Sequence, residues 1–158
     1  KAVVLLSDGV DTTSVFETAA SVNRDITESD VLIYPIRYNT YDDVQQSRRT
    51  TAPIQYDDDD KPYTVDARPG KGEREEDYAM AKEFLNSAAE KTGGHLYNVK
   101  STTNLDQAFA NIANELRKTY SLGYYPNSDR ESGPSFNIKV RVYRPDLKIR
   151  ARDSYSRR

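Results

Sequence analysis

The sequence predicts an α/β fold: a Rossmann-like parallel sheet with flanking helices, extended by an antiparallel β unit at the carboxyl end. Two short apolar runs, residues 2–6 and 31–37, flank a segment whose apolar residues have helical spacing, which is typical of a βαβ unit. From residue 136 onwards apolar and polar residues alternate, as in a half-exposed strand. We expect one domain, in which residues 120–158 pack on an α/β part formed by residues 1–119.

The first apolar run ends in Ser7, Asp8 and Gly9. An unbroken apolar run of this length is typical of a strand that is buried on both faces. Asp8 is therefore expected at the carboxyl end of that strand, which is the edge where open parallel sheets bind ligands. A carboxylate there could be a metal ligand, a nucleophile or an acceptor that caps nearby backbone N–H groups, and the residues alone leave these roles open.

The segment after this strand is expected to be a helix. Ser14 and Glu17 fit a capping box, in which each side chain binds a free backbone N–H group. Apolar residues then form one stripe that ends near Glu28, at Val15, Ala19, Val22 and Ile26. The next strand contains Pro35, and since proline has no N–H group, one edge of this strand should be unpaired or bulged there.

Residues 39–76 interrupt the alternation of strands and helices. They are polar and acidic, show no periodicity and leave the strand edge that also carries Asp8. An insertion of this kind is far longer than an ordinary loop. Its four consecutive aspartates at residues 57–60 lack the spacing of a calcium-binding loop, so we interpret the segment as a solvated acidic loop.

The remaining part of the α/β unit predicts a helix, a short strand and a second helix. The first helix is capped by Asp77, ends at Gly93-Gly94, and buries a stripe formed by Ala81, Phe84, Leu85 and Ala88. The strand covers residues 95–99, with His95 at its amino end, opposite Asp8, where a structural or surface role is expected. The second helix starts near Thr103 and has an apolar stripe, formed by Leu105, Phe109, Ile112 and Leu116.

After a turn at residues 127–134, two alternating strands are expected on either side of a turn at residues 144–146. Their apolar face should pack on the domain and bury about four side chains. Their other face is basic, with Lys139, Arg141, Lys148, Arg150 and Arg152. This face could follow phosphates, but it has almost none of the interleaved aromatic residues that stack on bases. We therefore expect a solvated face, or one covered by the acidic segment 39–76, and no nucleic-acid partner.

The composition excludes several classes of protein. Among 158 residues, 36% are hydrophobic and 30% charged, there is no cysteine, and the net charge is −2. A disulfide framework and thiol chemistry are therefore excluded, and no apolar run is long enough to span a membrane. The chain starts inside a strand without an initiator methionine, so we expect it to be a piece of a longer protein, and it shows no signal peptide.

The order of these elements, together with several sequence pieces, resembles the carboxyl-terminal half of a von Willebrand factor A (VWA) domain. The resemblance is greatest to the bacterial, acidobacterial-type VWFA-related family. It is carried by residues 2–14, 31–38, 89–99, 116–126 and 139–155. The most specific pieces are Thr-Gly-Gly before the third strand and Tyr-Ser-Leu-Gly-Tyr-Tyr-Pro after the last helix.

This resemblance implies a non-enzymatic module that binds a ligand or a protein with the help of Mg²⁺, or of Ca²⁺ or Mn²⁺, in a secreted or cell-envelope protein. Asp8 would be the metal ligand, and Ser7, Gly9 and Asp11 would belong to the ligand-site loop. The Asp-x-Ser-x-Ser loop of the family's metal site is absent from this sequence. We therefore expect tight metal binding only in the complete domain, since one carboxylate does not hold Mg²⁺.

The resemblance also implies that the strand carrying Asp8 is central, so that this chain leaves residues 3–6 as an unpaired edge. A partner segment that supplies the missing strands is then expected. Two other functions stay open. The chain could be a structural or interaction unit without a metal site, or, with less support, a phosphohydrolase that uses Asp8 as nucleophile. Such enzymes need a second aspartate two residues later, whereas here Asp11 is three residues later.

Overall fold

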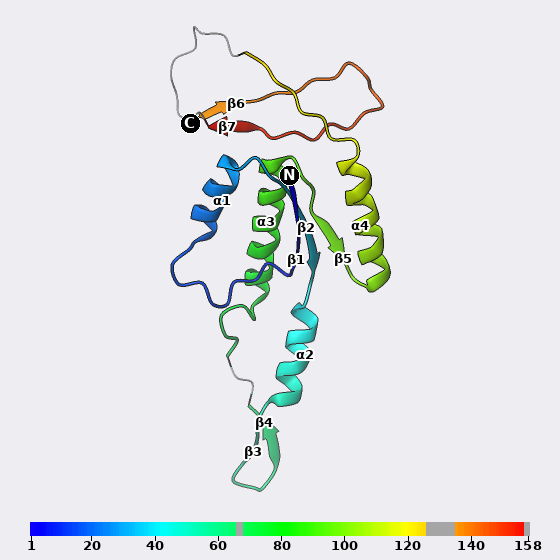
Figure 1. Cartoon of the computed structure of the whole chain (residues 1–158). Helices are drawn as coiled ribbons and strands as arrows, with labels where there is room; N and C mark the ends of the chain where they lie inside the picture. The colour runs from blue at the N-terminus through cyan, green and yellow to red at the C-terminus, as the bar shows by residue number, and fades with distance from the viewer. Residues whose placement is uncertain (66–67, 126–134, 157–158) are drawn as a thin grey trace.

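The structure, a computed structural model, describes residues 1–65, 68–125 and 135–156. Within these residues a three-stranded parallel sheet in the order β1-β2-β5 has helices on both faces (Figure 1). The strands are β1 (Ala2–Ser7), β2 (Leu32–Tyr38) and β5 (Tyr97–Val99). The helices around the sheet are α1 (Ala19–Glu28), α3 (Glu75–Thr92) and α4 (Thr102–Leu116). The predicted α/β class with a parallel sheet is confirmed.

The central strand β2 carries the core on both of its faces. Tyr34 and Ile36 pack with Val99 of β5 and with Ala108 and Ile112 of α4. On the other face, α3 covers β2 and buries Leu85 and Ala89 beside Leu96. Because apolar side chains of β2 are removed from water on both faces, this strand stabilises the sheet more than its neighbours do.

Pro35 lies in this central strand without interrupting it. It pairs with Leu5 of β1 in an unbroken register, whereas the pairing with β5 starts one residue later, at Ile36. Neighbouring residues of a strand direct their N–H groups to opposite sides. The Leu32 N–H group donates to the carbonyl oxygen of Lys1, just before β1, so it faces β1. An N–H group at Pro35 would therefore face β5, at a position just before β2 and β5 begin to pair. The strand is unpaired on that side but not bulged.

Strand β1 lies at the edge of the sheet, and the expectation that it is buried on both faces is wrong for this chain. Val3 and Leu6 are 50% and 55% exposed. β1 pairs only with β2 among the described strands, so the alternation of N–H groups leaves those of Val4 and Leu6 at the open edge. The expected unpaired apolar edge is thus confirmed, and the central position of the strand is not.

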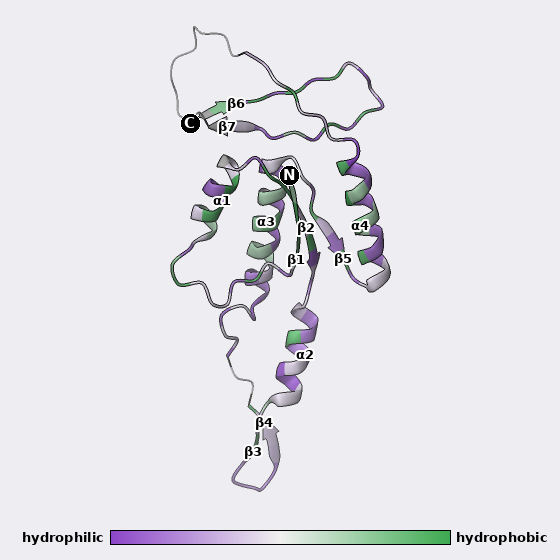
Figure 2. Cartoon of the chain, in the orientation of Figure 1, coloured by the Kyte–Doolittle hydropathy of each residue, from purple (hydrophilic) through white to green (hydrophobic). Residues whose placement is uncertain are grey.

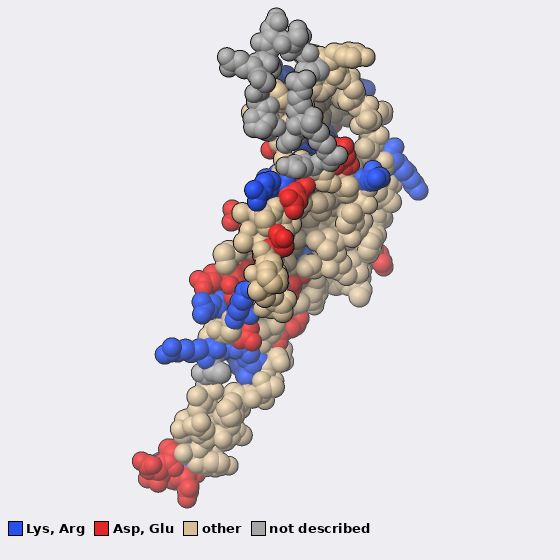
Figure 3. All heavy atoms as spheres, turned by 60° about the vertical axis from the view of Figure 1, so that its left-hand side comes forward, with Lys and Arg blue, Asp and Glu red and all other residues tan. Residues whose placement is uncertain are grey.

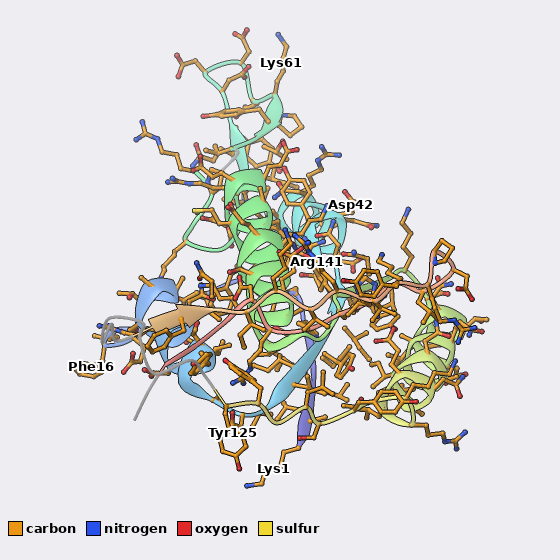
Figure 4. The ribbon with its side chains drawn as sticks, turned by 90° about the horizontal axis from the view of Figure 1, so that it is seen from above. Lys1, Phe16, Asp42, Lys61, Tyr125 and Arg141 are labelled. Atoms are coloured by element: carbon orange, nitrogen blue, oxygen red, sulfur yellow. The ribbon has the colours of Figure 1, made fainter. Side chains whose placement is uncertain are left out.

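Helix α1 begins later than the sequence predicted. Its capping box is formed by Thr18 and Ser21, whereas the Ser14 N–H group bonds to the Asp11 carboxylate instead. Val15 and Phe16 consequently lie before the helix and are 81% and 93% exposed; Phe16 points away from the protein (Figure 4). The predicted end at Glu28 is confirmed.

The segment expected to be a loop is largely folded. It contains helix α2 (Tyr41–Thr51) and a hairpin of β3 (Ile54–Tyr56) and β4 (Pro62–Thr64), which projects away from the sheet (Figure 1). The four aspartates at residues 57–60 form the turn of this hairpin and make an acidic tip (Figure 3). Asp57 stabilises the turn by accepting the N–H groups of Asp59 and Lys61, and all four side chains are exposed, as expected.

The boundaries of the later elements differ slightly from the prediction. Asp77 is the third residue of α3, where it accepts the Arg74 N–H group at 3.2 Å, so it does not occupy the cap position itself. Gly93 ends α3 in the left-handed region, at φ 81°. Gly94 passes so close to β2 that a Cβ atom there would lie 1.9 Å from the Ile33 carbonyl oxygen. Only glycine fits this crossing, which fixes α3 against the sheet.

The carboxyl-terminal residues form an antiparallel unit, but the expected long strands are wrong. Only β6 (Ser135–Asn137) and β7 (Ser154–Ser156) pair, although the two segments stay side by side up to the turn at residues 144–147 (Figure 1). Hydrophobic and hydrophilic residues alternate along them (Figure 2), and Phe136, Ile138 and Val140 are half-buried. The turn expected at residues 127–134 lies outside the described residues.

Two arginines connect this tail to the α/β unit. Arg152 donates to the Ser29 carbonyl oxygen at the end of α1, at 2.6 Å, and to Asp30. Arg150 donates to Glu115 of α4. The basic face, expected to be solvated or covered by residues 39–76, is therefore partly turned towards α1 and α4. Val142, Leu147 and Ile149 are 44%, 51% and 39% exposed, so the tail buries less apolar surface than predicted.

Candidate functional site

A pocket lies where the three parallel strands end. Its volume is about 460 Å³, and its walls come from the carboxyl ends of all three strands and from the start of α4. The apolar wall consists of Leu6, Tyr38, Val99 and Leu105. The polar groups come from Ser7, Asp8, Thr40, Ser101 and Thr102. Apolar walls with a few converging polar groups are typical of small-ligand sites, and this edge is where parallel sheets bind ligands.

Asp8 is the only carboxylate among the described lining residues. Its Oδ1 atom accepts the Val10 N–H group at 3.1 Å, and its Oδ2 atom accepts the Thr40 hydroxyl at 2.8 Å. The Thr40 oxygen lies 3.1 Å from the Tyr78 hydroxyl of α3. Asp8 thus stands at the carboxyl end of a parallel strand beside the start of the segment 39–76, as predicted.

Ser7 and Gly9 fix the turn in which Asp8 lies. The Ser7 hydroxyl oxygen accepts the Gly9 N–H group at 2.9 Å. Gly9 has φ +81°, and a Cβ atom there would lie 2.8 Å from Leu85 Cδ1 and 3.1 Å from the Ala81 carbonyl oxygen. A side chain at this position would therefore be strained and would push the loop off α3.

Asp11 does not line the pocket and has a different role. Its Oδ1 atom accepts the N–H groups of Thr13 and Ser14, at 3.2 and 2.8 Å. Its Oδ2 atom lies 3.5 Å from Lys71 Nζ. The Ser14 hydrogen bonds, together with Lys71, hold the pKa of Asp11 below its usual value. Asp11 therefore stabilises the loop after β1, and it is not brought together with Asp8 in the pocket.

The pocket does not form a complete metal site. Within the described ranges, no three His, Asp or Glu side chains are grouped closely enough to hold a metal ion. Both oxygens of Asp8 already accept hydrogen bonds, and the Ser101 hydroxyl caps α4. Mg²⁺ requires near-octahedral oxygen coordination, which one engaged carboxylate and a few hydroxyls do not supply.

Sequence reasoning missed Thr40, Tyr78, Ser101 and Thr102. The position of three of them could have been predicted, because Thr40, Ser101 and Thr102 follow β2 and β5 within a few residues. Parallel strands end at the same edge of a sheet, so hydroxyls that follow different strands converge there. Tyr78 had no such signal, since its contact with Thr40 joins α3 to a residue 38 positions earlier.

Arg37 lies beside the pocket as a buried cation. It is 8% exposed and pairs with Ser7 in the sheet register. One terminal nitrogen donates to Asn39 and to the Tyr78 carbonyl oxygen, both at 3.3 Å. Its Nε atom is buried and has no hydrogen-bond partner among the described residues. A buried guanidinium that lacks a partner for Nε costs stability.

None of the described helices is both long and apolar enough to cross a bilayer. Comparison of the chain with protein-family models, with curated proteins and with solved structures finds no match.

Proposed function

We propose that this chain is a non-enzymatic binding module of the VWA type, and that its ligand binds in the pocket at the carboxyl ends of β1, β2 and β5. The observation that supports this proposal most is the position of Asp8, which stands in a pocket of about 460 Å³ among hydroxyls from three strand ends. The lining contains no lysine, histidine or cysteine among the described residues. Catalysis by a nucleophile needs an activating base or cation in contact with it, and the Arg37 guanidinium beside the pocket donates to Asn39 and to the Tyr78 carbonyl oxygen instead.

In this proposal a divalent cation binds weakly at Asp8 in this chain, and tightly only when further oxygen ligands are added beside Asp8. The open edge of β1 is the place where a partner strand could pair, because its N–H groups and its apolar side chains are both exposed. Strand addition to an exposed edge is a general mode of protein recognition. A partner segment on β1 would cover this surface and place its own side chains next to the pocket.

Magnesium chloride is the probe that tests the role of Asp8. We expect amide NMR spectra of the full chain to show saturable shifts at Ser7, Asp8 and Thr40, with an affinity no tighter than about millimolar because one carboxylate is present. Asp8→Asn should abolish these shifts, since it removes the charge but keeps the shape. Asp58→Asn, at the exposed hairpin turn, should leave them unchanged. Shifts that survive in Asp8→Asn would contradict the proposal.

A structural role for Asp8 is the second candidate, and its hydrogen bonds to Val10 and Thr40 favour it. In that case Asp8→Asn and Asp8→Ala lower the melting temperature, and Mg²⁺ causes no localised shifts in the wild type. The same titration therefore separates the two functions. A tight one-to-one Mg²⁺ complex of the chain alone would contradict the incomplete metal site that both candidates share.

A further inference from the structure

A second cavity lies between β5, α4 and the tail. It has a volume of about 370 Å³ and is lined by His95 and Tyr97, by Glu115 and Lys118 near the end of α4, and by Arg150 of the tail. His95 precedes the amino end of β5, so this cavity is at the opposite end of the parallel strands from Asp8. Its lining shares no residue with the pocket that contains Asp8.

The carboxylate of Glu115 in this cavity is already neutralised. Its Oε1 atom accepts the Tyr97 hydroxyl at 2.8 Å and also a terminal N–H group of Arg150. Burial disfavours the ionised form, but the hydrogen bonds from Arg150 and Tyr97 outweigh it and hold the pKa of Glu115 below its usual value. Burial and the bond to Glu115 raise the pKa of Tyr97 to about 12. Glu115 is therefore ionised and Tyr97 neutral at physiological pH.

The remaining groups give the cavity an excess of positive charge and of donors. Lys118 and Arg150 face one carboxylate, so the net charge of the lining is +1 with His95 neutral. Lys118 makes no ion pair with any residue that the structure describes, and Arg150 uses only one terminal nitrogen for Glu115. Asn114 adds an amide to the wall. These donors come from α4, from Lys118 just after its end, and from the tail.

We propose that this cavity binds a small oxyanion, a phosphate or carboxylate group carried by a small molecule, between Lys118, Arg150 and His95. Ammonium and guanidinium groups are the side chains that bind such anions, the guanidinium through paired N–H groups. The volume of about 370 Å³ is in the range of small-molecule sites. The negative end of the α4 dipole opposes an anion here, so we expect an affinity of about millimolar for inorganic phosphate.

His95 offers a direct report on the cavity because it is the only histidine of the chain. Its ring contacts Tyr97 edge-on, with centroids 4.8 Å apart. Burial, followed by the charge of Arg150 and to a lesser degree Lys148, lowers the pKa of His95, whereas Glu115 acts in the opposite direction. An anion bound beside the ring favours the imidazolium form and raises this pKa again.

The test is a pH titration of the His95 ring by NMR on the full chain, with sodium phosphate, sodium succinate or sodium chloride at a constant ionic strength of about 0.1 M. We expect phosphate or succinate, but not chloride, to raise the pKa by about 0.5 or more. A rise with phosphate alone identifies phosphate as the ligand group, and a rise with both identifies oxyanions generally.

Lys118→Gln should reduce this rise by at least half, whereas Lys100→Gln, beyond the opposite end of β5, should leave it intact. Amide spectra and melting temperatures show that both variants are folded. The proposal fails if chloride produces the same rise as phosphate, if no anion changes the pKa, or if Lys118→Gln responds like the wild type.

Discussion

Thr92 shows how one side chain can satisfy a backbone N–H group that has no hydrogen-bond partner in the sheet. The β5 ladder begins at Ile36, so the N–H group of Ile33, which faces the same side, has no strand partner. The Thr92 hydroxyl oxygen lies 3.0 Å from it and accepts this hydrogen bond, while the hydroxyl donates to the Ala88 or Ala89 carbonyl at the end of α3. Thr92 is 3% exposed, so water cannot replace it.

We therefore expect Thr92→Val to be destabilising although it preserves the shape of the side chain. It leaves the part-buried Ile33 N–H group without its hydrogen-bond partner, at a cost of about 1–3 kcal/mol. This corresponds to a fall in melting temperature of about 2–4 °C per kcal/mol for a chain of this length. Thr92→Ser is the matched control, because it keeps the hydroxyl and loses only a methyl group. Equal melting temperatures for the two variants would show that the hydrogen bond contributes nothing.

The residues around Asp8 show which part of the site the sequence could predict. The position of Asp8 followed from the apolar run before it, since a run of that length ends at a sheet edge. Its partners did not follow, because Thr40 is 32 positions away and its hydroxyl reaches Asp8 only after β1 and β2 are paired. The burial of Arg37 could not be predicted for the same reason, because it depends on how α3 covers the sheet.

At the scale of elements, the predicted helices were those with an apolar stripe. Helix α2 was missed because it buries no side chain and so has no such stripe. Its signal was electrostatic: Asp42 and Asp43 lie in its first turn and Arg48 and Arg49 in its last, which complements the helix dipole. The tail strands were predicted too long because alternation shows which face is apolar, whereas pairing depends on the partner segment.

The attachment of the tail to α1 gives a prediction at this scale. Arg152→Met keeps the length of the side chain but removes its bond to the Ser29 carbonyl oxygen at 2.6 Å. We expect a loss of about 1 kcal/mol, because a hydrogen bond from a charged group to a half-buried carbonyl contributes more than the ion pair with exposed Asp30. Thermal unfolding measures this loss.

Arg141→Met serves as the control, because Arg141 is exposed and lies in the same tail (Figure 4). It should leave the melting temperature unchanged. Since the bond to Ser29 joins a charge to a carbonyl, the difference between the two variants should persist at high salt. A difference that disappears in salt would assign the effect to Asp30 instead.

At the scale of the whole molecule, two appendages extend from opposite ends of the parallel strands. The β3–β4 hairpin projects from the carboxyl ends, where Asp8 lies, and the tail covers the amino ends (Figure 1). The hairpin strands are fully exposed and pair only with each other among the described strands. The tail instead contacts α1, and its backbone at Ala151 and Arg152 lies against Gly93. The two appendages should therefore contribute very differently to stability.

Deleting residues 135–158 should lower the melting temperature by about 5 °C or more. The deletion removes the hydrogen bonds of Arg150 and Arg152 and three half-buried apolar side chains, and 1 kcal/mol moves the melting temperature of a chain of this size by about 2–4 °C. Replacing residues 54–64 by a short Gly-Ser linker is the control and should change it by less than about 2 °C, because these residues bury no side chain. A cooperative transition at an unchanged temperature after the tail deletion would show that the tail is an independent appendage, contrary to the single domain inferred from its contacts.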